Sequence, residues 1–183
     1  MDAITLLKND HKAVDKLFKS YEKAGDRAKA TKKKLVAQMI KELSVHAAIE
    51  EEIFYPAARH AVEETTPDVL EALEEHHIVK WVLSELEGMD PSDERFDAKV
   101  TVLIELVRHH VDEEEHEFFP EVRRGLGRTR LGEIGEQLEK AKRTAPTRPH
   151  PRQPDTPPGN LMAGLVAGVV DHARGAVKEM AAR

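Results

Sequence analysis

The chain has 183 residues, of which 34% are charged and only 4% are aromatic. This composition favours a helical protein over a sheet protein, which would need more β-branched and aromatic residues. With 28 basic and 34 acidic residues the formal net charge is −6, which argues against nucleic acid as the main partner.

The chain contains no cysteine, which excludes disulfides, zinc–thiolate sites and cysteine-ligated iron–sulfur clusters. Any metal must therefore be held by histidine, carboxylate or tyrosine. The first residues show no basic segment followed by an apolar stretch, and no run of about 18 apolar residues occurs. We expect a cytoplasmic protein without a transmembrane segment.

The first half of the chain predicts two helices. Apolar residues recur with the period of an amphipathic helix over residues 3–23, and glycine and aspartate at 25–26 end that pattern. A second helix is predicted over 27–55. Pro56 should end or kink it, because proline lacks the N–H and clashes with the preceding turn. A short helical piece, AARHAVEE, is expected next.

The second half predicts a similar pair. A third helix runs over 66–88, with Pro67 in its first turn and Gly88 at its end. The turn MDPSDERF leads into a fourth helix over 93–124, and a shorter helix over 130–143 is expected to cover one end or side. The sequence thus predicts an all-α domain over residues 1–143, an up-down-up-down antiparallel four-helix bundle.

The last forty or so residues differ in character. Residues 144–160 hold six of the ten prolines and no periodic apolar face, which predicts an extended or disordered linker. Residues 161–183 predict an additional C-terminal amphipathic helix. Its apolar positions would dock on the bundle, on a second copy or another protein, or on a membrane surface, and we favour the protein contacts or disorder. These positions are Leu161, Leu165, Val169, Ala173 and Val177.

One phrase occurs twice. HAAIEEEIFYP begins at His46, and HVDEEEHEFFP begins at His110, 64 residues later. Each phrase lies on the second helix of a predicted pair, and the first helix of each pair carries a histidine after an acidic residue, at His11 and His76. The spacing from His11 to His46 is 35 residues and that from His76 to His110 is 34. The repeating unit is therefore a helical hairpin.

The repeat predicts a cluster of donor groups inside the bundle. Residues four apart share one helix face, so Glu50 points the same way as His46, and Glu114 the same way as His110. Within each hairpin the two histidines lie at similar depth, offset by about 7 Å along the axis. Two buried glutamates without partners would be very unfavourable, and bound cations remove that objection. Nitrogen and oxygen ligation favours iron or manganese, then zinc, with copper less suited.

These motifs resemble the hemerythrin-like family, also named the HHE cation-binding domain. Both of its phrases are present, and the resemblance covers roughly residues 1–125. It implies an up-down four-helix bundle with a non-haem di-iron centre, in which two iron ions are bridged by oxo or hydroxo groups and by carboxylates. The ligands it implies are His11, His46, Glu50, His76, His110 and Glu114.

The chain departs from this pattern at one ligand. Oxygen-carrying hemerythrins use a fifth histidine, four residues after another on one helix, and here the corresponding positions hold Lys80 and Trp81. The candidates for an additional donor or a residue beside the ligands are His77, His109, Tyr21 and Tyr55. Asp10 and Glu75 are expected either to accept hydrogen bonds from ligand imidazoles or to be surface charges. Glu51, Glu52, Glu113 and Glu115 are expected beside the ligands or in solvent.

The resemblance implies a protein that binds or turns over O2, hydrogen peroxide or nitric oxide. The enzymatic version is catalase-like decomposition of peroxide. The alternative is a sensor of O2, redox state or iron without turnover, in which the proline-rich linker and C-terminal helix carry the signal to a protein partner. Iron storage ranks lowest, because the Glu-x-x-His motif of ferritin-like helices is absent from the repeated phrases.

Overall fold

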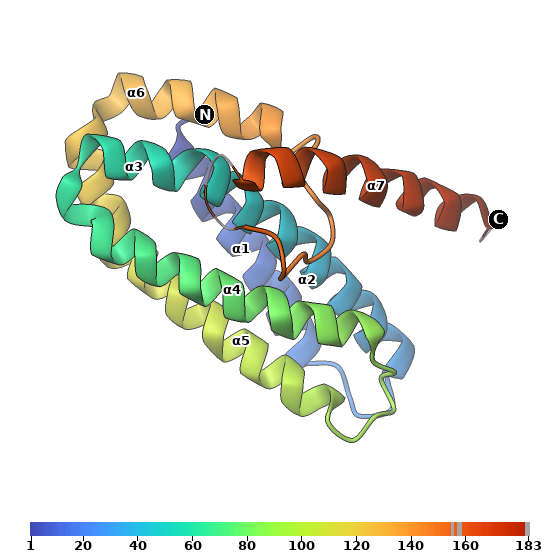
Figure 1. Cartoon of the computed structure of the whole chain (residues 1–183). Helices are drawn as coiled ribbons and strands as arrows, with labels where there is room; N and C mark the ends of the chain where they lie inside the picture. Colours follow the sequence, from blue (N-terminus) through green and yellow to red (C-terminus); the bar gives the residue numbers. More distant parts are fainter. Residues whose placement is uncertain (155, 157–158, 182–183) are drawn as a thin grey trace.

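The computed structural model describes residues 1–154, 156 and 159–181, and every regular element in these ranges is a helix (Figure 1). The side chains of 161, 162, 165 and 175–181 lie outside the description. Four long helices form an antiparallel bundle, which confirms the predicted fold class. They are α1 (Ala3–Glu22), α2 (Lys29–Ile49), α4 (Thr66–Gly88) and α5 (Phe96–Glu113).

Local sequence signals set several helix ends. Asp2 caps α1, because its carboxylate accepts a hydrogen bond from the backbone N–H of Thr5 at 3.0 Å. Pro67 lies in the first turn of α4, where its missing N–H has no partner to lose. The helix then ends at Gly88, so both predicted ends of α4 are confirmed.

Pro56, which was expected to end or kink the second helix, instead follows a change in the helical hydrogen bonding, and the expected short helix is present. A widened π-helical turn, η1 (Glu50–Phe54), joins α2 to the next helix, α3 (Tyr55–Ala61). The Tyr55 N–H reaches back five residues to the Glu50 carbonyl, so the hydrogen bonding changes register just before the proline. Pro56 therefore stands in the first turn of α3, where proline is tolerated.

The second copy of the phrase forms the same structure, and the helical path runs to a break at Gly127, close to the predicted end of the fourth helix. The π-helical turn η3 (Glu114–Phe118) joins α5 to α6 (Phe119–Ala141), and the helix predicted over 130–143 is the later part of α6. Gly127 separates the two parts of α6 with a φ of 70°, a left-handed conformation that glycine adopts readily. Beyond this bend the later part of α6 packs against α1 (Figure 1).

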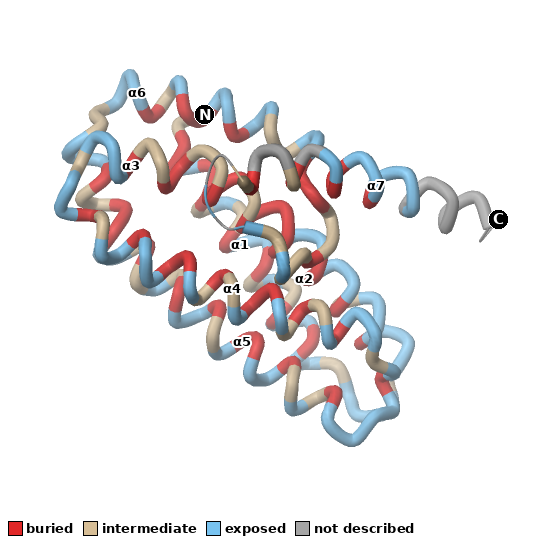
Figure 2. The backbone as a smooth tube through the Cα atoms, in the orientation of Figure 1, coloured by how far each residue is buried: buried red, intermediate tan, exposed pale blue. Residues whose placement is uncertain are grey.

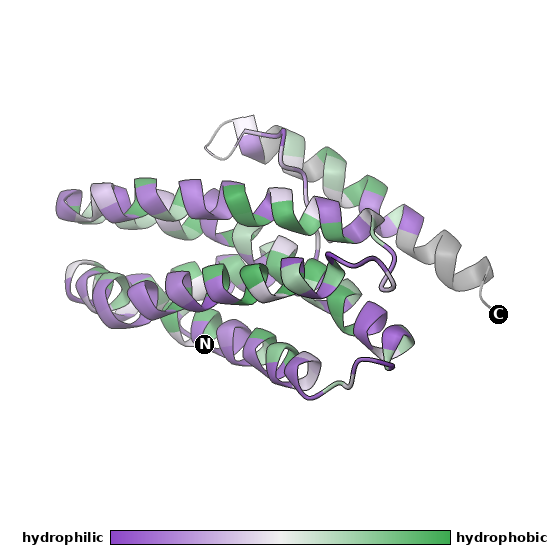
Figure 3. Cartoon of the chain, turned by 90° about the horizontal axis from the view of Figure 1, so that it is seen from below, coloured by the Kyte–Doolittle hydropathy of each residue, from purple (hydrophilic) through white to green (hydrophobic). Residues whose placement is uncertain are grey.

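The core consists of two apolar clusters with the histidines between them. On α1, Leu7 belongs to one cluster and Val14 to the other, and His11 lies between them in the chain. The same order recurs around His76 of α4, and it is reversed around His46 and His110 on the antiparallel α2 and α5. Figure 2 shows buried residues along the facing sides of the bundle helices, and Figure 3 shows hydrophobic residues alternating with hydrophilic ones along them. The apolar clusters thus seal both ends of a polar layer.

A short η2 turn (Glu63–Thr65) precedes α4. The proline-rich segment and the last helix pack against the bundle. Ala145, Pro146 and Pro149 are buried, and α7 (Gly159–Ala181) contacts η1. The buried Asp171 of α7 accepts a hydrogen bond from the backbone N–H of Arg148 at 3.2 Å.

The expected apolar face of the C-terminal helix is described only in part. Val169 is 73% exposed and Ala173 is exposed, so these two do not pack on the bundle. Contact with a second copy, another protein or a membrane stays a prediction. Small residues make the contact instead, because Gly168 lies against the Thr144 carbonyl. Leu161, Leu165 and Val177 fall outside the described side chains. Within the described ranges, no helix has the length and hydropathy that a membrane span requires.

The packing of α6 on α1 predicts opposite effects at two glycines of one helix. A Cβ at Gly135 would lie 2.1 Å from the carbonyl oxygen of Met1, whereas a Cβ at Gly132 meets nothing within 4 Å. We expect Gly135→Ala to lower the free energy of unfolding by about 1–3 kcal/mol through overpacking. Gly132→Ala, the control, should raise it by up to about 1 kcal/mol through helix propensity. Denaturant unfolding measures both, and a Gly135→Ala protein as stable as the control would contradict this packing.

Candidate metal centre

The structure brings the six predicted donors together in one buried layer, with each exposed by 6% or less. Each hairpin contributes a pair of imidazoles. The Nε2 atoms of His11 and His46 lie 3.2 Å apart, and those of His76 and His110 also lie 3.2 Å apart. Two nitrogens at this separation can both bond one ion at the usual metal–imidazole distance of about 2.0–2.1 Å.

The two glutamates connect the hairpins. Glu50 Oε2 lies 3.1 Å from Nε2 of His46 and 3.5 Å from Nε2 of His76. Glu114 Oε2 lies 3.3 Å from Nε2 of His11 and 3.5 Å from Nε2 of His110. Each carboxylate therefore touches one imidazole of each pair, which is the arrangement that a ligand shared between two ions requires.

The electrostatics of the carboxylates call for added positive charge. Burial, followed by the charge of Glu114, raises the pKa of Glu50 well above its usual range. Burial also acts to raise the pKa of Glu114, but the neighbouring imidazoles outweigh it and hold that pKa at about 2. Glu50 Oε1 and Glu114 Oε2 are buried and have no hydrogen-bond partner. Buried unpaired carboxylate oxygens are unfavourable unless they coordinate a cation, so the donor set fits a metal.

The imidazoles are suited to the same role. Burial lowers the pKa of His46 to about 4 and that of His76 well below its usual value. Both rings are therefore neutral near pH 7 and keep a lone pair on one nitrogen. Neutral imidazole is the form that binds a metal.

An outer set of carboxylates orients the rings. Because an ionised carboxylate can only accept, a ring facing one donates its Nδ1–H outward and turns the Nε2 lone pair inward. His46 differs from the other three histidines. Its Nδ1 lies 3.8 Å from Asp10, and the oxygens of Asp10 accept hydrogen bonds from Lys142 at 2.6 and 2.8 Å. The other three Nδ1 atoms lie within hydrogen-bond distance: His11 to Glu115 at 2.9 Å, His76 to Glu51 at 3.0 Å, and His110 to Glu75 at 2.7 Å.

These outer residues follow the repeat. Asp10 and Glu75 directly precede a donor histidine and face the other histidine of their own hairpin. Glu75 contacts His110 at hydrogen-bond distance, as one of the two expectations had it, whereas Asp10 lies 3.8 Å from His46 Nδ1. Glu51 and Glu115 directly follow a donor glutamate and face a histidine of the opposite hairpin. Sequence reasoning did not assign these two to a ring. Their matched position after Glu50 and Glu114 was the available signal.

Tyr55 is the one residue at this layer among the four considered as additional donors. Its O–H donates to Glu114 Oε1 at 2.9 Å, and its oxygen lies 3.4 Å from His76 Nε2. Burial, followed by the charges of Glu114 and Glu50, raises the pKa of Tyr55 well above its usual value. The phenol therefore keeps its proton at neutral pH.

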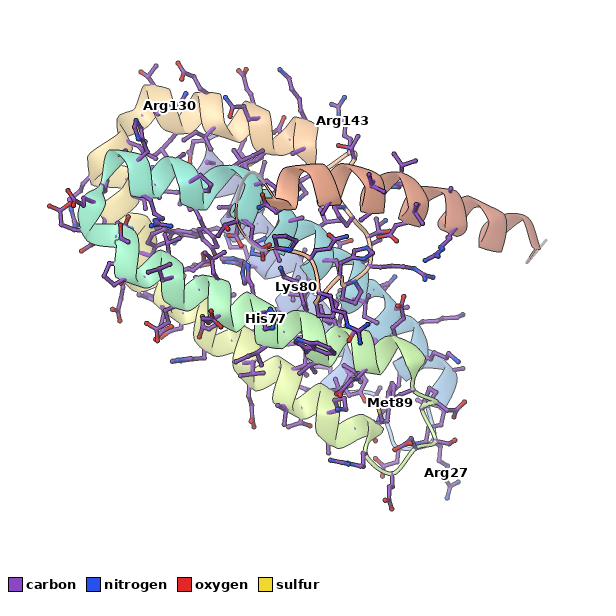
Figure 4. All side chains as sticks on the ribbon, viewed as in Figure 1. Arg27, His77, Lys80, Met89, Arg130 and Arg143 are labelled. Carbon is purple, nitrogen blue, oxygen red and sulfur yellow. The ribbon has the colours of Figure 1, made fainter. Side chains whose placement is uncertain are left out.

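The other three candidates lie elsewhere. Tyr21 belongs to the apolar cluster that includes Val14 and Phe18, away from the donor layer. Its O–H donates a hydrogen bond to Asp97. His77 accepts a hydrogen bond from Trp81 at 3.1 Å, and the side chain of His109 is 64% exposed. Lys80 occupies a position where oxygen carriers have their fifth histidine. It donates a hydrogen bond to Glu51 at 2.8 Å. Figure 4 labels Lys80 and His77 on α4.

A pocket of about 260 Å³ reaches all four imidazoles from between α1 and α5. Exposed basic and acidic side chains lie at its rim. They include Lys12, Arg108, Asp112 and His116. Its walls are apolar and comprise Val14, Phe18, Leu43, Val79, Val107 and Val111. Such a passage admits a small molecule with little charge.

Known proteins share this chain's pattern. The chain is 28% identical over 166 residues to an uncharacterized hemerythrin-like protein of Schizosaccharomyces pombe, covering 90% of this chain and 81% of that protein. It is also 28% identical to a DNA nickase of Nostoc sp., over 78% of this chain but only 39% of the nickase. A crystal structure of a hemerythrin HHE cation binding domain-containing protein from Mycobacterium kansasii has a TM-score of 0.66 at 25% identity. That match covers 78% of this chain and 86% of that one.

The match to a family model covers the bundle and both repeated phrases. The model describes the hemerythrin HHE cation binding domain and matches residues 2–122, which contain all six donors. On this match, and on the buried layer of imidazoles and carboxylates, the chain belongs to the hemerythrin HHE cation-binding family.

Proposed function

We propose that the protein holds two non-haem iron ions and uses them to bind or turn over O2, hydrogen peroxide or nitric oxide. The imidazole nitrogens and carboxylate oxygens suit iron or manganese, with zinc less favoured, and the resemblance to hemerythrin-like proteins favours iron. Bound iron would supply reversible one-electron redox chemistry and a position for a small ligand. The proposed ligands are His11, His46, Glu50, His76, His110 and Glu114, with Tyr55 as a candidate for a further donor.

The apolar pocket is the observation that carries this proposal. It leads to the imidazoles of both pairs, and its walls offer few hydrogen-bonding groups to a polar substrate. O2 and nitric oxide are small and uncharged, and hydrogen peroxide is small and neutral at physiological pH. A passage with apolar walls therefore suits these molecules better than it suits a charged metabolite.

The residues around the centre have separable roles. Glu51, Glu75 and Glu115 fix the tautomer and orientation of their imidazoles, which strengthens them as ligands. Tyr55 orients Glu114 through its O–H and keeps a proton beside the centre. The two apolar clusters exclude water from both ends of the layer, which strengthens electrostatic interactions within it.

A sensor without turnover is the second candidate, and the position of the tail favours it. A small pocket between the tail and the bundle is lined by Glu51, Lys80, His150 and Gly164. Glu51 accepts from Lys80 and faces His76, so the tail lies next to a residue that orients a proposed ligand. A change at the centre could pass through Glu51 to the packing of α7. A protein partner that reads the tail would then detect it.

Metal analysis and peroxide assays test the proposal directly. We expect about two irons per chain, as a paired-ion site requires, with near-ultraviolet absorption from charge transfer to iron. Oxygen evolution on adding peroxide would support the catalase-like version. An inert iron protein whose partner affinity changes with oxidation state would support the sensor. A purified protein that binds no iron after anaerobic reconstitution would contradict both.

The buried glutamates predict opposite effects on metal binding and on stability. We expect Glu50→Gln to remove most of the bound iron, because the amide cannot replace a bridging carboxylate. In metal-free protein the same change should raise the free energy of unfolding by about 1 kcal/mol or more. The reason is that the folded protein no longer has to bury this glutamate, whose pKa burial and Glu114 raise. Glu42→Gln, at an exposed position of the same helix, is the control and should change neither. A Glu50→Gln protein that keeps both irons and its spectrum would refute Glu50 as a ligand.

The pocket predicts that a bulky side chain in its wall slows the reaction without removing metal. Val111 lines the passage on α5, whereas Val102 on the same helix is 49% exposed and lies outside it. We expect Val111→Phe to slow the spectral response to peroxide or nitric oxide at least several-fold at unchanged iron content. Val102→Phe should react like the wild type. Equal rates for the two variants in stopped-flow absorbance would argue against this passage.

A further inference from the structure

A second pocket reaches the same centre from a different face of the bundle. It lies between α4 and α5, has a volume of about 70 Å³, and ends on His110 and Glu114. Phe118 and Ala72 are its apolar residues, and every other lining side chain except His110 is acidic. These are Asp68, Glu71, Glu75, Glu113, Glu114 and Glu117.

The two pockets differ in charge, and the difference suggests different cargo. The first pocket is lined by side chains of both signs, with Lys12 and Arg108 beside Asp15, Asp112 and Glu115. No described basic group lines the second pocket except His110 at its inner end. The acidic groups influence one another, because burial, followed by the charges of Glu121, Glu117 and Glu71, raises the pKa of Asp68. A mouth with one sign of charge concentrates ions of the other sign.

Both ends of the acidic pocket offer donors to a cation. At its inner end Glu114 is 3% exposed and its Oε2 has no hydrogen-bond partner. Glu75 and Glu113 line the pocket, and the exposed His109 lies beside them outside its lining. The three side chains each present one ligand atom, all within 4.8 Å of one another. Glu75 also accepts from His110 Nδ1 at 2.7 Å, so one side chain belongs to the outer group and contacts an inner imidazole.

We propose that the acidic pocket between α4 and α5 is the entrance for the metal ion, with Glu75, His109 and Glu113 as a transient outer site for a divalent cation. The ion would pass from this outer site to His110 and Glu114, while small neutral molecules use the apolar pocket between α1 and α5. This inference rests on the proposed metal centre and adds the route by which it fills.

The rate of metal loading tests the entrance. Metal-free full-length protein is mixed with Co²⁺, and absorbance of the bound ion is followed by stopped flow. The triple variant Asp68→Asn, Glu71→Gln, Glu117→Gln neutralises the mouth and alters none of the proposed ligands. We expect it to load about tenfold more slowly at low ionic strength, with the difference shrinking as salt screens the mouth. The final cobalt spectrum and stoichiometry should equal those of the wild type.

Matched variants separate the entrance from net charge and from the outer site. Glu42→Gln, Glu136→Gln, Glu139→Gln makes the same charge change at exposed positions away from the pocket and should load like the wild type. His109→Gln should slow loading several-fold, whereas His116→Gln, at the rim of the other pocket, should not.

Equal loading rates for the mouth variant and its control, with normal final spectra, would overturn the entrance alone. A mouth variant with an altered final spectrum would also overturn it, because those residues would then belong to the centre. A wild-type protein that binds no Co²⁺ would overturn the proposed metal centre and the entrance with it.

Discussion

Two carboxylates buried among four imidazoles are the constraint on which the rest of the structure depends. Glu50 and Glu114 lie in a layer closed above and below by hydrocarbon, and one oxygen of each lacks a hydrogen-bond partner. A helical bundle built only for stability would place leucine or phenylalanine there. The arrangement is understandable if the layer binds cations. The neutral rings of His46 and His76 and the carboxylates that face the Nδ1 atoms then serve the same function.

The surrounding structure maintains that layer. The outer carboxylates hold three of the rings at 2.7–3.0 Å, and the two π-helical turns begin at Glu50 and Glu114. A widened turn changes the direction of the side chains that follow it, so the aromatic residues after each glutamate pack into one apolar cluster. Local backbone irregularity therefore coincides with the donors in both halves of the chain.

Much of this was predictable from the sequence, because duplication and helical spacing are properties of the chain itself. The four bundle helices and the convergence of six donors follow from apolar periodicity and from the spacing of His46 and Glu50. Three features needed the structure. The widened turn that accommodates Pro56 depends on the packing of the aromatic residues, the bend at Gly127 depends on where α6 can dock on α1, and the ring partners of Glu51 and Glu115 lie across the hairpins. No local pattern encodes such contacts between distant segments.

The sharing of each glutamate between hairpins has an evolutionary consequence. One hairpin supplies two imidazoles and one carboxylate, and that carboxylate reaches its second imidazole only on the other hairpin. Half of the present chain would thus lack a complete set of donors. If the chain arose by doubling of a shorter gene, the ancestral hairpin would have had to assemble as a symmetric pair of separate molecules before fusion made the pairing permanent.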